Sequence, residues 1–235
     1  MVNKSSFLAG SNHKTGTVWI AQILGDLCSE TGRNFFNISF EKIEKSQIND
    51  RPVVLFDHYS KFNDSDEITD GMVGFTITRH PIDQIISATR YHHISSEDWL
   101  HIPDKKFNGM TYQQKINSIG GWQNKLIFEM KNASIAHTFN QIEHDARLMR
   151  IKYEDLINEY PRPRVFDELF EYIKLDDEDI DSFIKNYLKN HIRTGYKSEH
   201  IIDGSVNQRY RFWTDKCERV YQRIFGDIAS QLGYN

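Results

Sequence analysis

Short apolar runs alternate with amphipathic helical stretches along most of the chain. Phe7-Leu8-Ala9 is too short for a helix and ends in small polar residues, which is typical of a buried strand that leads into a loop. Beyond that loop, apolar residues recur at i, i+3, i+4 and i+7, the spacing of one face of an amphipathic helix. They are Ile20, Ile23, Leu24 and Leu27. The start of the chain therefore predicts a strand, a loop and a helix.

The same pattern predicts four further strands. They lie at 35–40, 52–56, 72–78 and 148–153. The run at 52–56 is apolar throughout, as expected of a strand that is buried on both faces in a parallel sheet. Residues 42–51 and 63–70 are rich in polar residues and predict surface connections.

Helices are expected between and after these strands. Pro81 is well placed as a first helical residue, and Thr111 with Gln114 forms a capping box that opens another helix. Gly120-Gly121 predicts a break in that helix, and residues 91–109 are expected to be irregular. Three more helices are predicted, one from Pro163, one over 180–188 and a last one over 217–232 that Gly233 ends.

Strands that alternate with helices predict an α/β protein with a mostly parallel central sheet and helices on both faces. At 235 residues, the chain is long enough to bury a sizeable core. We expect a single domain over 1–235. In such sheets, ligands bind at the carboxyl ends of the strands.

Composition excludes several classes of protein. The formal net charge is −4 and no long basic run occurs, which argues against nucleic acid as a partner. No apolar run is long enough to cross a membrane. Cys28 and Cys217 are far apart and are predicted to be buried free thiols in a reducing compartment. The sequence contains no cluster of cysteine or histidine residues that would predict a metal site. We expect a cytoplasmic protein.

The loop before the first helix carries the first candidate chemistry. A lysine, two hydroxyls and a glycine stand beside a helix N-terminus, where backbone N–H groups and the helix dipole favour an anion. These residues are Lys14, Thr15, Gly16 and Thr17. The alternative is an ordinary turn with a surface lysine. A nucleoside-triphosphate P-loop needs Gly-Lys followed by Ser or Thr after a glycine-led loop, and the order here differs.

This loop resembles the Lys-Ser-Gly-Thr-Thr-Trp loop of PAPS-dependent sulfotransferases. The matching residues are Lys14, Thr15, Gly16, Thr17, Val18 and Trp19. The resemblance implies that the loop binds the 5′-phosphosulfate end of the donor. It also implies the sulfotransferase fold, which is related to that of P-loop NTPases.

Two further segments are similar to motifs of the same family. Arg79, Pro81, Asp83 and Ser87 match an Arg-x-Pro-x-Asp-x-x-x-Ser pattern. The resemblance implies that Arg79 and Ser87 bind the 3′-phosphate of the donor. Without the resemblance, an arginine in a salt bridge and a serine on a helix surface would explain these two residues equally well. Tyr153 opens a Tyr-Glu-Asp-Leu match, which implies that it lies near the adenine together with Trp19. The alternative for both aromatic residues is ordinary core packing.

The last family motif, Arg-Lys-Gly-x-x-Gly-x-Trp, is altered in this chain. Ile202-Asp203 stands where the family has Arg-Lys, and Asn207 replaces the second glycine. If this loop still closes over the donor, another cation must bind the 3′-phosphate. The candidates are Arg193, Lys197, Arg209 and Arg211, of which Arg209 is counted among the donor-binding residues.

His58 is the candidate general base. It follows the predicted strand at 52–56, where members of the family carry a catalytic histidine. A neutral imidazole can accept a proton from a hydroxyl or an amine near pH 7. Asp57 could orient this ring or act as the base itself. His92, His93 and His101 lie in the irregular stretch and are expected to line an acceptor pocket.

The sequence thus predicts transfer of a sulfuryl group from PAPS to a hydroxyl or amine of a small-molecule acceptor, with PAP as the product. His58 removes the proton, and Lys14 stabilises the charge on the leaving phosphate. No metal is needed in this scheme. A nucleotide-dependent kinase or NTPase, with Asp57 as a magnesium ligand, and a non-catalytic nucleotide-binding module are the alternatives. The identity of the acceptor and the presence of a homodimer stay open.

Overall fold

The computed structural model describes residues 4–39, 43–48, 51–62, 66–133, 139, 145–195 and 208–234. The chain divides into two compact units. Unit 1 comprises Met1–Arg79 and Ile142–Ser198, and unit 2 comprises His80–Gln141 and Glu199–Asn235. That the whole chain acts as a single domain stays a prediction.

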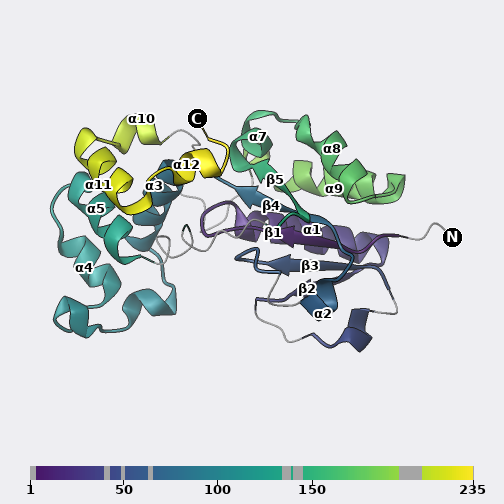
Figure 1. The fold of residues 1–235 in the computed structure, drawn as a ribbon, viewed down its shortest axis with the longest axis horizontal. Helices are drawn as coiled ribbons and strands as arrows, with labels where there is room; N and C mark the ends of the chain where they lie inside the picture. The colour runs from purple at the N-terminus through teal and green to yellow at the C-terminus, as the bar shows by residue number, and fades with distance from the viewer. Residues whose placement is uncertain are drawn as a thin grey trace. The chain divides into compact units, whose positions relative to one another are not determined.

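A parallel sheet forms the centre of unit 1 (Figure 1). Its five strands in the described part of the chain follow the order β2-β3-β1-β4-β5. They span Phe7–Gly10 (β1), Asn34–Asn37 (β2), Val53–Asp57 (β3), Gly74–Thr78 (β4) and Leu148–Lys152 (β5). All four strand pairings are parallel, so the predicted sheet is confirmed. Tyr153, which was expected to end the last strand, instead begins a helix.

Helices α1, α7, α8 and α9 accompany the sheet of unit 1. They span Thr17–Thr31 (α1), Tyr153–Asn158 (α7), Val165–Tyr172 (α8) and Asp177–Asn190 (α9). The predicted apolar face of α1 is buried, and Ile23 meets Phe75 of β4 and Phe183 of α9 around a small apolar cavity. Arg33, just before β2, forms a fully buried ion pair with Asp179 of α9, with Nη2 and Oδ2 2.5 Å apart.

A second apolar layer covers the opposite face of the sheet. Its buried core consists of Leu8, Val53, Leu55, Phe62 and Leu148. Ile48 from the 3-10 turn η1 (Lys45–Ile48) and Ile68 from helix α2 (Asp66–Thr69) pack against this core. The prediction of a loop at 63–70 is therefore wrong at 66–69, where Ile68 has an apolar surface to cover and one helical turn forms.

Unit 2 is helical in its described part. It contains α3 (Pro81–His92), α4 (Tyr112–Ser118), α5 (Trp122–Asn132), α10 (Arg209–Phe212), α11 (Asp215–Phe225) and α12 (Ile228–Gln231), with the 3-10 turns η3 (Asp98–His101) and η4 (Lys105–Phe107). Pro81 is the first residue of α3, and the capping box of Thr111 and Gln114 is present, as predicted. The prediction of one continuous helix over 217–232 is wrong, because α11 ends at Phe225 before Gly226 and the separate short helix α12 follows.

A buried polar network lies inside unit 2. His92 Nδ1 is 2.9 Å from Glu129 Oε1, and both side chains are fully buried. The hydroxyl of Tyr112 donates to Glu129 Oε2 at 2.9 Å. His92 therefore cannot line an open acceptor pocket, contrary to the prediction. The sequence pattern around His92 did not indicate this contact, because Glu129 lies on a helix 37 residues further along the chain.

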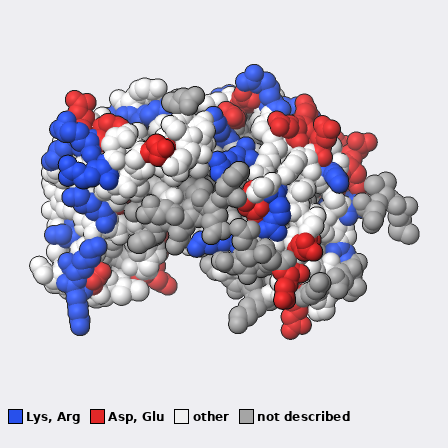
Figure 2. Space-filling model, viewed as in Figure 1, with Lys and Arg blue, Asp and Glu red and all other residues white. Residues whose placement is uncertain are grey.

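Charge is distributed unevenly over the surface (Figure 2). Acidic side chains gather over α8 and α9 of unit 1, and basic side chains gather along the edge of unit 2 that carries α11. On α11, the exposed residues Lys216, Arg219 and Arg223 share one helix face. A net charge of −4 thus does not exclude local basic surface.

Candidate functional site

The loop between β1 and α1 is held together by its own hydroxyl groups. Thr15 Oγ1 donates to the carbonyl of Asn12 at 2.7 Å and accepts from the Asn12 N–H at 2.9 Å. Thr17 Oγ1 donates to the same carbonyl at 2.9 Å. Thr15 is fully buried, and its hydroxyl fixes the shape of the loop.

The N-terminus of α1 is suited to an anion. Gly16, the N-cap residue, has a left-handed conformation with φ of 89°, no side chain caps the helix, and the first turn contains no acidic residue. Helix geometry leaves the N–H groups of this turn without intrahelical acceptors, at the positive end of the dipole. Lys14 has φ of 64°. A positive φ is uncommon for residues other than glycine, and residues with such strained backbone conformations are found mostly at functional sites.

Arg79 joins this loop to the end of β4. Its Nη1 donates to the carbonyl of Lys14 at 3.0 Å, and its guanidinium lies 4.8 Å from the centre of the Tyr153 ring. Burial raises the pKa of Tyr153, and the nearby charge of Arg79 partly opposes that effect. Residues from three separate motifs of the sequence thus meet at the carboxyl ends of β1, β4 and β5.

Trp19 is buried beside this cluster. Its ring meets Tyr153 edge-on with centroids 6.4 Å apart, and it also contacts Tyr187 and His191. Its Nε1 has no hydrogen-bond partner among the described residues. Trp19 thus has aromatic rings as its neighbours, and the adjacent Val18 is 42% exposed.

His58 follows β3 directly and is half-buried. Its Nε2 lies 3.0 Å from the side-chain nitrogen of Asn37, which stands at the end of β2. Burial lowers the pKa of His58, and the charge of Asp57 only partly offsets this. The imidazole is therefore neutral at pH 7, as a general base must be. The contribution of Asn37 was missed, because strand order cannot be read from local pattern.

Asp57 has a structural role in the turn after β3. Its carboxylate accepts hydrogen bonds from the hydroxyl of Ser39 at 2.6 Å, from the N–H of Tyr59 at 3.0 Å and from the N–H of Lys61 at 2.7 Å. A carboxylate that is engaged in this way stabilises the backbone near His58. These contacts do not favour Asp57 as a base or as a magnesium ligand.

The remaining donor-binding candidates lie in unit 2. Ser87 is a buried residue of α3. Arg209 Nη1 donates to the fully buried carboxylate of Asp83 at 2.6 Å, and its N–H donates to the same group at 2.8 Å. Arg90, one turn after Ser87 on α3, donates to Gln208 at 3.0 Å and is a cation that sequence reasoning missed. Lys197 and residues 202–207 lie outside the described residues.

The other candidate residues have local partners. Arg193 lies over the ring of Tyr160, and Arg211 lies over the ring of Phe212. In unit 2, His93 is beside Lys125, and His101 Nε2 is 3.2 Å from the carbonyl of Ser95. Burial and the neighbouring Lys125 both lower the pKa of His93.

Neither metal-ligand clusters nor membrane-spanning helices are found in the described part of the chain. No group of three or more His, Cys, Asp or Glu residues there is placed to hold a metal ion. No helix within the same residues combines the length and apolar character needed to span a bilayer. Cys28 and Cys217 are free and buried, as predicted.

Comparison with known proteins supports the fold. No family model matches the sequence, and no curated protein matches it. The structure is similar to a solved structure of the mouse sulfotransferase SULT7A1 complexed with PAP, with a TM-score of 0.57. The match covers 97% of this chain and 87% of that chain at 13% sequence identity. The resemblance to sulfotransferases is thus confirmed for the fold, a parallel α/β sheet flanked by helices.

Proposed function

We propose that this protein is a PAPS-dependent sulfotransferase that transfers a sulfuryl group to a hydroxyl or amine of a small-molecule acceptor. The observation that carries the proposal is the contact of Arg79 with the carbonyl of Lys14 and with the ring of Tyr153. Three segments that resemble family motifs come together there, on a sulfotransferase fold. A chance likeness of one short segment does not account for that convergence.

The chemistry of the loop fits the phosphosulfate end of the donor. The uncapped N-terminus of α1 offers backbone N–H groups, and Lys14 adds a positive charge. By the resemblance, Arg79 and Ser87 bind the 3′-phosphate, and Tyr153 and Trp19 lie near the adenine. The buried pair of Arg209 and Asp83 makes Arg209 a less direct ligand than the sequence implied, because its guanidinium already has a charged partner.

In the proposed reaction, the acceptor attacks the sulfur in line with the bond to the leaving phosphate oxygen. His58 accepts the proton of the acceptor, since burial keeps its imidazole neutral. Lys14 and the N–H groups of the first turn of α1 stabilise the negative charge that grows on the leaving oxygen. Recognition of a 3′-phosphate by Arg79 and Ser87 would discriminate against ATP, which lacks that group.

A thermal-shift titration with PAP, compared with ATP and magnesium, tests the donor site. A ligand at a hundredfold excess over its dissociation constant stabilises the native state by about 2.7 kcal/mol. We expect stabilisation by PAP only, and its loss in the Lys14→Ala variant. Lys185→Ala is the matched control, because Lys185 pairs with Glu30 on the surface of unit 1 and is 63% exposed.

Each result has a clear meaning. Stabilisation by magnesium-ATP alone would replace the proposal with a kinase or NTPase. Binding of PAP without any transfer to a panel of hydroxyl and amine acceptors would favour a non-catalytic module. If transfer is found and His58→Ala retains full activity, the base is another group and the mechanism proposed above is wrong.

A further inference from the structure

The end of β2 contacts His58 at two points within unit 1. Asn37 and Phe56 are paired in the register of β2 and β3, and the rings of Phe56 and His58 meet edge-on with centroids 5.3 Å apart. Because side chains alternate along a strand, Asn37 and His58 lie on the same face of the sheet. The side-chain nitrogen of Asn37 is 3.0 Å from Nε2 of the ring, and Ser39 Oγ accepts from the backbone N–H of His58 at 2.8 Å.

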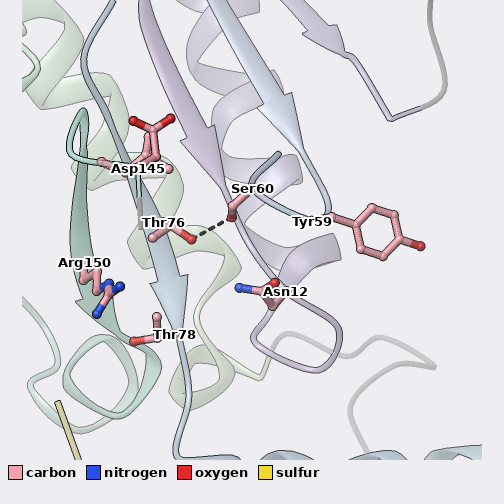
Figure 3. Close-up of a pocket in the computed structure, with 8 residues that line it drawn as sticks. Asn12, Tyr59, Ser60, Thr76, Thr78, Asp145 and Arg150 are labelled. Carbon is pink, nitrogen blue, oxygen red and sulfur yellow. Dashed lines mark hydrogen bonds between the residues drawn. The ribbon is translucent and has the colours of Figure 1, made fainter. Parts of the chain in front are cut away.

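The turn that carries His58 is fixed by further contacts. Asp57 accepts the hydrogen bonds described above, one of them from Ser39. The hydroxyl of Ser60 donates to a backbone carbonyl of the β1–α1 loop at 3.0 Å and lies 2.7 Å from the hydroxyl of Thr76. Figure 3 shows this second contact, which ties the turn to β4. Since the backbone is held on both sides, the orientation of the His58 ring depends on contacts of the ring itself, such as the one with Asn37.

The amide of Asn37 can form a hydrogen bond with either charge state of an imidazole. Its nitrogen can only donate, so Nε2 is the acceptor in the observed arrangement, and the neutral ring carries its proton on Nδ1. The side-chain oxygen of Asn37 is buried and has no hydrogen-bond partner among the described residues. Half a turn of the amide exchanges two groups of similar size, and it would bring this oxygen to a protonated Nε2.

We propose that Asn37 is the positioning residue for His58, and that it makes Nε2 the ring nitrogen that receives the proton of the acceptor. The role in catalysis rests on the proposed sulfotransferase activity, whereas the choice of ring nitrogen does not. On binding, the hydroxyl or amine of the acceptor replaces the amide N–H at the lone pair of Nε2. As the acceptor atom bonds to sulfur, the bond from sulfur to the leaving phosphate oxygen breaks and the proton moves to Nε2. The oxygen of Asn37 then accepts a hydrogen bond from the new N–H.

An uncharged amide suits this place better than a carboxylate would. Burial lowers the pKa of His58, and the charge of Asp57 opposes that effect only in part. A second carboxylate against Nε2 would favour the protonated ring and raise the pKa, because a carboxylate can only accept. Asn37 holds the ring without adding a charge, so the base stays neutral at pH 7.

NMR spectra of the isotope-labelled protein, recorded without any ligand, test the choice of ring nitrogen. Two-bond proton–nitrogen correlations distinguish the two neutral tautomers, and His58→Gln identifies the signals of this ring. We expect the neutral ring to carry its proton on Nδ1. Asn37→Asp should raise the titration midpoint of His58 by about one pH unit. Asn34→Asp is the matched control, because Asn34 begins the same strand but faces the other side of the sheet, and it should leave the midpoint unchanged.

Steady-state kinetics with PAPS and the panel of hydroxyl and amine acceptors test the positioning role. Asn37→Leu keeps the approximate size of the side chain and removes its hydrogen bond, so kcat should fall about tenfold while KM for PAPS stays unchanged. In Asn37→Asp, the acid limb of the kcat/KM profile should move to higher pH together with the NMR midpoint. Asn34→Asp should alter neither quantity.

The two experiments fail in different ways. Unchanged unfolding temperatures show that the variants are folded. A neutral wild-type ring with its proton on Nε2, or an unchanged midpoint in Asn37→Asp, would overturn the choice of ring nitrogen. An unaltered kcat in Asn37→Leu would overturn the positioning role. The expected NMR result in a protein that does not bind PAP would retain the control of the ring by Asn37 and refute the sulfotransferase activity instead.

Discussion

Replacement of Gly16 by alanine should destabilise the protein through two separable effects. The residue has φ of 89°, and a side chain in the left-handed region costs about 1 kcal/mol. A Cβ atom there would also lie 3.0 Å from Cε2 of Tyr153 and 3.3 Å from Cε3 of Trp19. Overpacking of this kind typically costs about 1–3 kcal/mol. We therefore expect Gly16→Ala to lower the free energy of unfolding by about 2–4 kcal/mol.

Two other glycines of the same helix region separate these effects. Gly32 ends α1 with φ of 73°, but a Cβ there meets nothing within 4 Å, so Gly32→Ala should cost only about 1 kcal/mol. Gly25 lies inside α1 and also has open space around it. Because alanine is the better helix former, Gly25→Ala should stabilise the protein by about 0.5–1 kcal/mol.

Urea denaturation of the three variants, followed by far-UV circular dichroism, measures these differences. The expected order of stability is Gly25→Ala, wild type, Gly32→Ala and then Gly16→Ala. Equal stability of Gly16→Ala and Gly32→Ala would show that the rings of Tyr153 and Trp19 yield without cost, and the contact argument would fail. A destabilised Gly25→Ala would contradict the reasoning about space around the helix.

Three further predictions concern titratable groups. Asp179→Asn should cost about 3–5 kcal/mol at pH 7, because it leaves the charge of Arg33 buried without its partner; a loss below about 1 kcal/mol in urea denaturation would refute this. Burial alone would raise the pKa of Asp179, but the hydrogen bonds and the charge of Arg33 outweigh burial, so the pKa is lowered. The stabilisation of the folded state by this ion pair is therefore complete above about pH 4 and is lost as the pH falls through the folded-state pKa of Asp179. Burial raises the pKa of Cys28 to about 12, so a thiol reagent at pH 8 should modify it only as fast as the protein unfolds, and rapid modification in native buffer would count against this. The imidazole of His58 should titrate below pH 6.5 in proton NMR, since burial lowers its pKa, and a higher midpoint would be inconsistent with the observed environment.

Local pattern was sufficient to predict most elements of this protein. The apolar spacing of α1, Pro81 at the start of α3 and the capping box at Thr111 depend only on residues within a few positions of one another. For the same reason, the loop at Lys14 and the segment at Arg79 can be related to a family from their residues alone. Errors occurred where local signals were weak, as at Gly226, which divides the last helical stretch.

Only the tertiary structure decided which residues meet. Strand order brings Asn37 next to His58, and packing joins Arg79 to the carbonyl of Lys14 across 65 positions of sequence. Packing paired His92 with Glu129 inside unit 2, against what the position of His92 in the sequence suggested. The physical reason is that these contacts result from the packing of whole strands and helices, and periodicity within a segment carries no information on which segments become neighbours.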